Sequence, residues 1–391
     1  RTPPSSLKLL AQYEAPSITV ALPLSGRLAS AGKAVRDGMV AGYLSEQDQT
    51  RAAPINAKDL SVSTAATTSV SFIDSNAIDD ASLLTQIVDS ANDVIVGPLL
   101  KERGQRLLAN VASSRLSRTL EKAAPAWIVL NRIDESGPSQ SMSTLSPVYQ
   151  FAPAIEDEAH TIAKHLRAQK YKRLMVVRNR ESWAYRATQE LKNSWQGKVI
   201  LADFERPREI TGTVGNAMGV ADSQTRHSAL QRVLNEEIEF LPRSREDLDA
   251  IVAFTNALES KALVPALQFH FADNLPVFAT SQSARSENLS DIAGFNVTEL
   301  PLLANPDSAA AAMRAVFDLG EQPLVDLYAV GLDAYRLATW VHWIQTHANH
   351  LDEGFRLRLK MASGQLVLGR NGQIERELSL AKISSGGTLS L

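Results

Sequence analysis

Residues 25–34, Ser-Gly-Arg-Leu-Ala-Ser-Ala-Gly-Lys-Ala, come nearest to a phosphate-binding loop. A P-loop needs four residues between its glycines and a Ser or Thr after its lysine, which reaches magnesium. Here five residues separate Gly26 from Gly32, and the lysine is followed by Ala34, so the nucleotide pattern is missing. Ser25 and Gly26 still fall where a strand meets a helix, and the free N–H groups there favour an anion. Capping of the helix by Ser25 is the alternative interpretation.

The histidines do not have the spacing of a metal site. His342, His347 and His350 are five and three residues apart, whereas a helical zinc pair requires i and i+4 with an acid nearby. A position near a helix C-terminus, where a cation is favoured, explains them better. The chain has no cysteine, which excludes thiolate metal sites and thiol catalysis. The sequence therefore predicts no metal and no cofactor.

No catalytic constellation of an enzyme is recognisable. The nucleophile elbow G-x-S-x-G is absent. Acidic pairs, such as Asp79 with Asp80 and the acids of residues 156–158, fall in the first turns of predicted helices, where carboxylates favour the helix dipole. A basic stretch between residues 164 and 180 has the composition of a solvated surface. Within it, Arg178 directly follows a predicted strand and is the arginine expected at a ligand cleft.

Strands and helices alternate along most of the chain. Apolar positions three and four residues apart predict a helix after nearly every short β-branched run, and this alternation is typical of a parallel sheet with right-handed crossovers. A stretch rich in Ser, Gly and Pro interrupts the pattern at residues 132–147. Strands are expected at 18–22, 70–74, 94–98, 126–130, 173–177, 199–202, 249–254 and 276–279, and helices at 28–45, 79–90, 99–111, 155–169, 183–196, 220–234, 257–271, 307–319 and 325–347.

The predicted fold class is α/β, with two doubly wound parallel-sheet lobes joined by a hinge. Ligands of such sheets bind beyond the carboxyl ends of the strands. Seven polar or flexible positions are expected there, around a cleft between the lobes: Ser25, Gly26, Asp74, Asn131, Arg132, Arg178 and Ser281. The expected organisation is a linker at 1–16, lobe one from 17–131 plus 292–354, a hinge segment at 132–147, and lobe two from 148–291 plus 355–391. An Asn-Gly step at 371–372 predicts a hairpin in the last of these segments.

The segment 205–248 is longer than a connection in such a lobe requires. It combines arginines with aromatic and aliphatic residues, which is the composition of protein–protein hot spots. Phe240, Arg243 and Arg245 are the partner-binding candidates. The alternative is that the segment packs on its own lobe and its arginines are merely solvated.

Composition excludes several classes of protein. The chain has 391 residues, 44% of them hydrophobic and 21% charged, which is an ordinary globular balance. Its 43 acids and 40 bases give a formal charge of −3, so a nucleic-acid-binding protein is not expected. No apolar run reaches 18 residues, so no membrane-spanning helix is expected either.

Residues 18–43, with the run Ala-Leu-Pro-Leu-Ser-Gly-Arg-Leu-Ala-Ser-Ala-Gly-Lys-Ala, resemble the first strand and helix of type I periplasmic binding proteins. The Val-Gly-Pro step at 96–98, the late helix around 326–335 and the closing hairpin near 364–372 are similar to the same fold. The resemblance covers nearly the whole chain from Ser17, and it implies a two-lobed fold with one interlobe cleft.

Several segments are more specifically similar to the C-terminal domain of LpoA-type penicillin-binding protein activators. Solute receptors generally lack residues 240–249, which makes that segment the most specific. The resemblance implies a periplasmic regulator that binds a class A penicillin-binding protein and stimulates peptidoglycan synthesis. It further implies a lipid anchor to the outer membrane, lying outside this chain, and an N-terminal helical-repeat domain. The segments are 99–101 (Leu-Leu-Lys), 130–132 (Leu-Asn-Arg), 239–249 (Glu-Phe-Leu-Pro-Arg-Ser-Arg-Glu-Asp-Leu-Asp) and 275–281 (Leu-Pro-Val-Phe-Ala-Thr-Ser).

One departure from the receptor pattern separates the possible functions. Amino-acid receptors of this fold usually offer hydroxyls after the Gly-Pro strand and at the next strand end, where this chain has Leu99 and Leu130. The sequence therefore favours a non-enzymatic regulator of a cell-wall synthase. A solute receptor with a small anionic or amino-acid-like ligand in the cleft is the second hypothesis, and an enzyme is a distant third.

Overall fold

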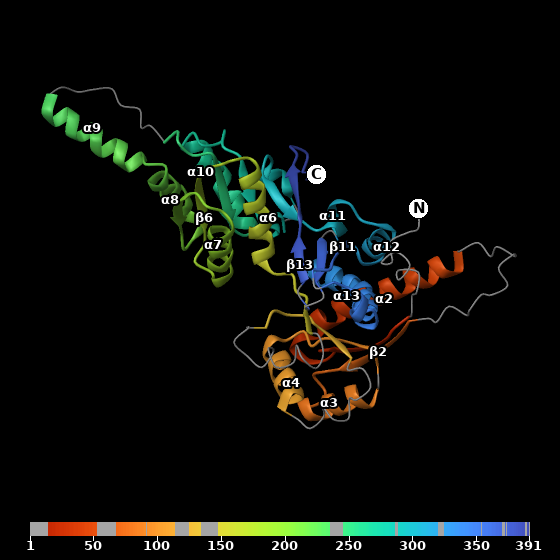
Figure 1. Cartoon of the computed structure of the whole chain (residues 1–391). Helices are drawn as coiled ribbons and strands as arrows, with labels where there is room; N and C mark the ends of the chain where they lie inside the picture. The colour runs from red at the N-terminus through yellow and green to blue at the C-terminus, as the bar shows by residue number, and fades with distance from the viewer. Residues whose placement is uncertain are drawn as a thin grey trace. The chain divides into compact units, whose positions relative to one another are not determined.

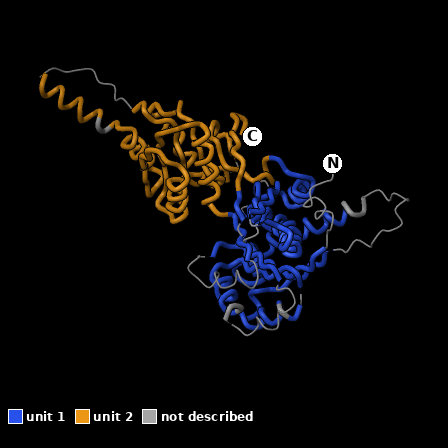
Figure 2. Tube along the Cα trace, viewed as in Figure 1, with its two compact units in different colours: residues 1–153, 305–376 blue, residues 154–304, 377–391 orange. Residues whose placement is uncertain are grey.

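The computed structural model describes residues 15–52, 68–90, 92–113, 125–133, 148–234, 245–285, 288–319, 324–352, 354–369, 372, 374–387 and 389–390. The chain forms two compact units, residues 1–153 with 305–376 and residues 154–304 with 377–391 (Figure 2). Each unit has its own mainly parallel sheet and its own buried core. Within the described ranges, no helix has the length and apolar character needed to cross a bilayer.

Five short parallel strands form the main sheet of the first unit, in the order β2-β1-β3-β4-β5 (Figure 1). The inner strands β3 and β4 are covered on both faces, and they are accordingly apolar throughout rather than alternating. The strands are β1 (Ser17–Leu22), β2 (Ser69–Asp74), β3 (Val94–Val96), β4 (Ala126–Val129) and β5 (Val148–Gln150).

Helices cover both faces of this sheet. Neighbouring residues of β1 belong to opposite cores: Val20 packs in the cluster of Val35 and Val330, and Ala21 in that of Leu83 and Leu107. The first cluster is covered by α2 (Ala29–Ala52) and α13 (Val325–Thr346), and the second by α3 (Asp80–Asp89) and α4 (Lys101–Ser113). α12 (Ser308–Phe317) lies beside α2.

Two glycines allow α2 and α13 to approach closely. A Cβ on Gly331 would overlap the carbonyl oxygen of Val35, and a Cβ on Gly38 would overlap that of Tyr328. Backbone therefore meets backbone at this crossing, and the apolar residues around it are fully buried.

Seven strands form the sheet of the second unit, in the order β15-β14-β10-β9-β8-β6-β7. The pairs from β10 to β7 are parallel, and β14 adds an antiparallel edge. The strands are β6 (Arg173–Arg178), β7 (Lys198–Asp203), β8 (Ala250–Phe254), β9 (Val277–Ala279), β10 (Asn296–Glu299), β14 (Ser379–Ile383) and β15 (Leu389–Ser390).

Helices also cover both faces of the second sheet. α6 (Ile155–Ala168) and α7 (Ser182–Ser194) pack with Val176 and Val252, whereas α8 (Ile210–Ala217) and α10 (Ala257–Phe269) pack with Val177 and Ala253. α9 (Val220–Leu234) extends away from the sheet of its unit (Figure 1). The short α11 is Pro301–Ala304, and single 3₁₀ turns occur at Gly26–Leu28, Pro207–Glu209, Ser281–Ala284, Leu289–Ile292 and Ala348–His350.

The fold class is confirmed, because two mainly parallel α/β sheets are present, but all three crossings between the units lie later than predicted. Residues 148–153, predicted for lobe two, contain β5, which pairs with β4 in the first unit. Residues 292–304, predicted for lobe one, contain β10, which pairs with β9 and β14 in the second unit. Residues 355–376, predicted for lobe two, form the small sheet β11 (Arg356–Lys360), β12 (Gln365–Gly369) and β13 (Ile374–Glu377). Leu366 and Leu368 of β12 pack in the α2–α13 core, which places this sheet in the first unit.

Other predicted segments lie outside the described residues. They are most of the linker, residues 1–14, and residues 134–147 of the hinge segment. The predicted Asn-Gly turn falls between β12 and β13, where Gly372 has a φ of +82°, a conformation that favours glycine. Asn371 of that turn is again outside the described residues.

Candidate functional site

In the first unit the structure brings Ser25, Gly26 and Asp74 together. Ser25 and Gly26 follow β1, and Asp74 is the last residue of the adjacent strand β2. Asp74 accepts hydrogen bonds from the backbone N–H groups of Leu24 and Asn76, each at 3.0 Å. Desolvation opposes the effect, but hydrogen bonds from Ser25, Asn76 and Leu24 hold the pKa of Asp74 below its usual value. Asp74 is therefore an ionised carboxylate that organises this loop.

The two neighbouring candidates of Asp74 have distinct local roles. Ser25 occupies the N-cap position of the following 3₁₀ turn, but its side chain forms no capping hydrogen bond there. The alternative interpretation, in which the Ser25 hydroxyl caps the helix, is therefore wrong for this turn. Gly26 has a φ of +71°, and a Cβ there would overlap the side chain of Asn76. Glycine is thus required for the close turn rather than for a phosphate.

Asn131 and Arg132 follow β4 in the same unit. The Asn131 amide donates to the carbonyl of Leu99 at 3.0 Å, and its side-chain oxygen accepts from the Arg132 backbone N–H at 2.9 Å. The Asn131 side chain thereby ties the end of β4 to the residues that follow β3. The Arg132 side chain is exposed.

In the second unit the side chain of Arg178 is only 9% exposed, and it already has partners within that unit. Its Nε and a terminal nitrogen donate to the two carboxylate oxygens of Asp203 at 2.7 and 3.0 Å. Its guanidinium carbon lies 4.2 Å from the ring centroid of Tyr185. The positive charge of the Arg178 guanidinium is therefore already paired with Asp203 and stacked on Tyr185, so it is not available to a ligand carboxylate.

Ser281, at the end of β9, is also engaged within its unit. Its backbone N–H and hydroxyl donate to the carboxylate of Glu158 at 2.7 and 2.9 Å, and the Thr298 hydroxyl donates to the same carboxylate. Glu158 is only 6% exposed and lies in the first turn of α6. The strand-end position that could hold an anionic ligand is filled by the chain's own carboxylate.

The predicted cleft would combine the first-unit candidates with Arg178 and Ser281, and this grouping across the units stays a prediction. Within each unit, Asp74, Asn131, Arg178 and Ser281 form hydrogen bonds to other groups of the same unit. Asn131, Arg178 and Ser281 are therefore engaged within their own units and do not present open polar groups to an amino acid ligand. The buried hydroxyl of Thr280, next to Ser281, has no hydrogen-bond partner among the described residues.

Of the partner-binding candidates, Phe240 and Arg243 lie outside the described residues. Arg245 is described, and it donates to Asp247 at 2.7 and 3.0 Å, while Arg173 of β6 donates to the same carboxylate. These hydrogen bonds, with that from Arg245 strongest, hold the pKa of Asp247 well below its usual range. Arg245 thus fastens the end of the 205–248 segment to its own sheet through Asp247.

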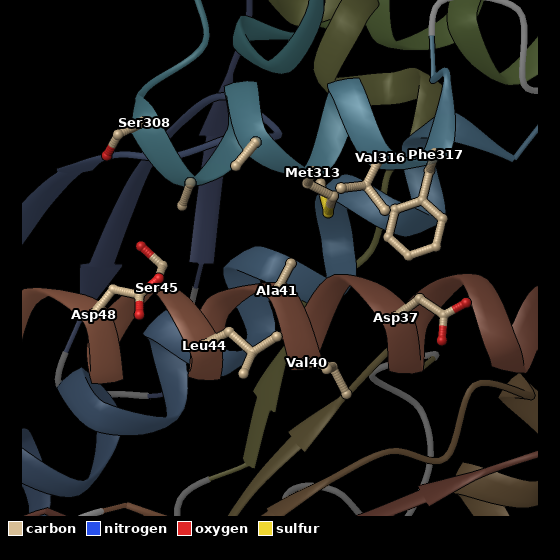
Figure 3. Close-up of a pocket in the computed structure, with 12 residues that line it drawn as sticks. Asp37, Val40, Ala41, Leu44, Ser45, Asp48, Ser308, Met313, Val316 and Phe317 are labelled. Carbon is tan, nitrogen blue, oxygen red and sulfur yellow. The ribbon is translucent and has the colours of Figure 1, made fainter.

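Sequence reasoning missed two features of the first unit. Asp333, in the middle of α13, is fully buried and accepts hydrogen bonds from the backbone N–H groups of Ala362 and Ser363 at 2.8 and 2.6 Å. No local pattern could have revealed these partners, which lie about 30 residues away. The second feature is an apolar groove between α2 and α12, and its signal was present as outward-facing Val40, Leu44 and Val316 (Figure 3).

The fold of the chain, with two units and a mainly parallel sheet in each, is like that of type I periplasmic binding proteins. A chain described as a branched-chain amino acid ABC transporter from Chromobacterium violaceum matches with a TM-score of 0.63 at 19% identity, covering 94% of this chain and 100% of that one. This likeness shows the fold alone.

The chain belongs to the family described as "LppC putative lipoprotein", whose model matches residues 3–386. The penicillin-binding protein activator LpoA of Photobacterium profundum is 24% identical over 382 residues, which are 95% of this chain and 56% of that protein. The C-domain of LpoA (YraM) from Haemophilus influenzae, described as a regulator of PBP1A, has a TM-score of 0.65 at 17% identity and covers 96% of this chain and 100% of that domain. The chain spans about half the length of the curated relatives it matches.

Proposed function

We propose that this chain is the part of a non-enzymatic regulator of peptidoglycan synthesis that binds and activates a class A penicillin-binding protein. The observation that carries the proposal is the family match over residues 3–386, whose relatives are named as penicillin-binding protein activators. The occupied strand ends support it, because Glu158 and Asp203 satisfy the groups that a solute receptor would direct to its ligand. The solute-receptor hypothesis is therefore not favoured.

The proposed location is the periplasm, with attachment to the inner face of the outer membrane through a lipid anchor outside this chain. The family description as a lipoprotein supports this location. Membrane contact would then come from the anchor alone, and the two units would face a synthase across the cell wall.

The experiment mixes the purified chain with a detergent-solubilised class A penicillin-binding protein and measures glycan polymerisation and peptide cross-linking. Stimulation that saturates with the amount of chain added is expected. Binding is measured separately by pull-down, because a bound but unstimulated synthase would contradict activation while leaving the interaction intact. Absence of both binding and stimulation would contradict the whole proposal.

The proposed partner surface is the 205–248 segment, with Phe240, Arg243 and Arg245 as its contact residues. Arginine beside aromatic side chains is typical of hot spots, where truncation costs about 2 kcal/mol or more. The Arg243→Ala and Arg245→Ala variants are therefore expected to lower stimulation. Arg167→Ala is the matched control, because Arg167 is an exposed arginine of the same unit on α6. Full stimulation by folded variants of both arginines would show that the synthase contacts another part of the chain.

A further inference from the structure

The groove between α2 and α12 of the first unit has a volume of about 590 Å³. The two helices run antiparallel along it, and Met313 and Phe317 point from α12 toward α2, with Phe317 nearest Asp37 (Figure 3). Ala41 of α2 and Ala312 of α12 line the groove with small side chains, which leave room for the backbone of another chain to approach. A groove of this size lies in the range of binding sites rather than of packing defects.

Large aliphatic side chains lie open to solvent along this groove. Leu44 is 54% exposed, Val316 is 75% exposed and Val40 is 36% exposed. All three line the same groove between two neighbouring helices, and exposed apolar residues gathered in one place mark interaction sites on otherwise polar surfaces. Met313 is buried beneath them and supplies a flexible, polarisable floor.

The charge around the groove selects the kind of occupant. None of the twelve described residues that line it is basic, and Asp37 and Asp48 of α2 stand toward its two ends (Figure 3). They are eleven residues apart, which is about 16 Å along a helix. Asp37 also pairs with the adjacent Arg36 at 2.7 Å, and Asp48 is exposed. A fatty acid, an anionic lipid or an acidic peptide would meet repulsion here, whereas a basic peptide would be attracted.

We propose that this groove binds an amphipathic helix of a partner protein. The helix would place apolar side chains at i, i+3 or i+4, and i+7 against Leu44, Val40 and Val316. A lysine or arginine near each end, about three turns apart, would face Asp37 and Asp48. The proposal does not depend on the proposed function, because the groove fits such a helix whether or not the partner is a synthase. This is the helix-in-groove mode, in which one apolar face carries the affinity.

The test uses the whole chain and an eighteen-residue alanine-rich peptide labelled with fluorescein. The peptide carries lysine at its third and fourteenth positions and leucine at its sixth, tenth and thirteenth, so that the leucines have the spacing i, i+4 and i+7 and all five side chains share one helical face. Binding is followed by fluorescence anisotropy at low and high salt. We expect the Leu44→Asp variant to weaken binding about tenfold or more. We also expect affinity for the native chain to fall as salt rises, because the end contacts are charged and at least the contact to Asp48 is exposed.

The matched control is Leu230→Asp, because Leu230 is also helical and is 55% exposed. It is expected to leave peptide affinity unchanged, while both variants keep the native circular dichroism spectrum. A second peptide with glutamate in place of both lysines is expected to bind at least about fivefold more weakly at low salt.

Three outcomes would overturn the proposal. Equal binding of the lysine peptide to native and Leu44→Asp chains would remove the groove as the site. Equal binding of the glutamate and lysine peptides would contradict the proposal that the partner helix is basic. Sedimentation velocity without peptide covers a third case: a native dimer that Leu44→Asp makes monomeric would show that a second copy of this chain occupies the groove.

Discussion

The buried carboxylate of Glu158 accepts two hydrogen bonds from Ser281, one from the backbone N–H at 2.7 Å and one from the hydroxyl at 2.9 Å. The two residues are 123 positions apart in the chain. Glu158 lies in the first turn of α6, and Ser281 begins the 3₁₀ turn that follows β9. This single carboxylate therefore joins a helix and a strand end that define one face of the second unit.

Replacing Glu158 by Ala is expected to destabilise the second unit by about 2–4 kcal/mol, because buried donors of Ser281 and Thr298 would lose their acceptor. Urea unfolding followed by tryptophan fluorescence measures the loss. Glu156→Ala is the control on the same helical turn, since Glu156 makes only a surface pair with Arg186, worth less than about 1 kcal/mol. Similar losses for the two variants would contradict a structural role specific to Glu158.

Asp333 is expected to make the first unit less stable as pH rises. Burial raises the pKa of Asp333 to about 6 from 3.8, although hydrogen bonds from Ser363 and Ala362 and the nearby Arg336 oppose the rise. The folded chain therefore holds this proton more tightly than the unfolded chain does. The stability this group contributes is complete below about pH 4 and is lost as pH rises to about 6, a change of about 3 kcal/mol.

Urea unfolding of the native chain and of Asp333→Asn between pH 4 and pH 7 tests this expectation. The difference in unfolding free energy between the two chains should move in favour of the variant as pH rises through this window. A difference that stays constant across the window would show that Asp333 does not titrate there.

Gly331→Ala is expected to lower the stability of the first unit by about 2–3 kcal/mol, because its Cβ would overlap the Val35 carbonyl and force α2 from α13. Gly212→Ala is the control, since no atom lies within 4 Å of the added carbon in α8. That control should be neutral or gain up to about 1 kcal/mol from helix propensity. Thermal unfolding compares the two, and an unaffected Gly331→Ala chain would show that the helices have room to move.

Asp247→Asn is expected to change stability by less than about 1 kcal/mol, because its pairs with Arg245 and Arg173 are largely exposed. If Asp247 positions Arg245 for the proposed partner, the variant should lower synthase stimulation as much as Arg245→Ala does. The double variant should then be no worse than either single one. Undiminished stimulation by Asp247→Asn would show that the position of Arg245 does not depend on Asp247.

The fold was largely predictable because helical and strand periodicities are local. The helix at 220–234 begins and ends at the predicted residues, and β6 differs from its prediction by one residue. The sequence did not reveal β5, because three residues between Pro147 and Phe151 are too short for a period. β11 was missed because Leu357 and Leu359 alternate with basic residues in a short surface strand.

The site was predictable only in part. The strand-end rule located Asp74, Arg178 and Ser281, since strand ends follow from the chain order. Their partners did not follow, because they come from distant segments: Glu158 was interpreted as an ordinary first-turn acid, and yet it fills the position beside Ser281. Pairing across more than a hundred residues leaves no periodic trace in a single sequence.

The close contact of α2 and α13 has a consequence for the opposite side of α2. Because the backbones of α2 and α13 are in contact at Gly38 and Gly331, α2 has little freedom to rotate about its axis. The orientation of the Val40 and Leu44 side chains is therefore fixed. The groove is therefore a preorganised binding site. A peptide that folds into a helix on binding loses conformational entropy, whereas the residues of the groove lose almost none. Affinity would accordingly increase with the helix propensity of the bound peptide. A single glycine or proline inside that peptide would weaken binding even at a position that does not contact the groove.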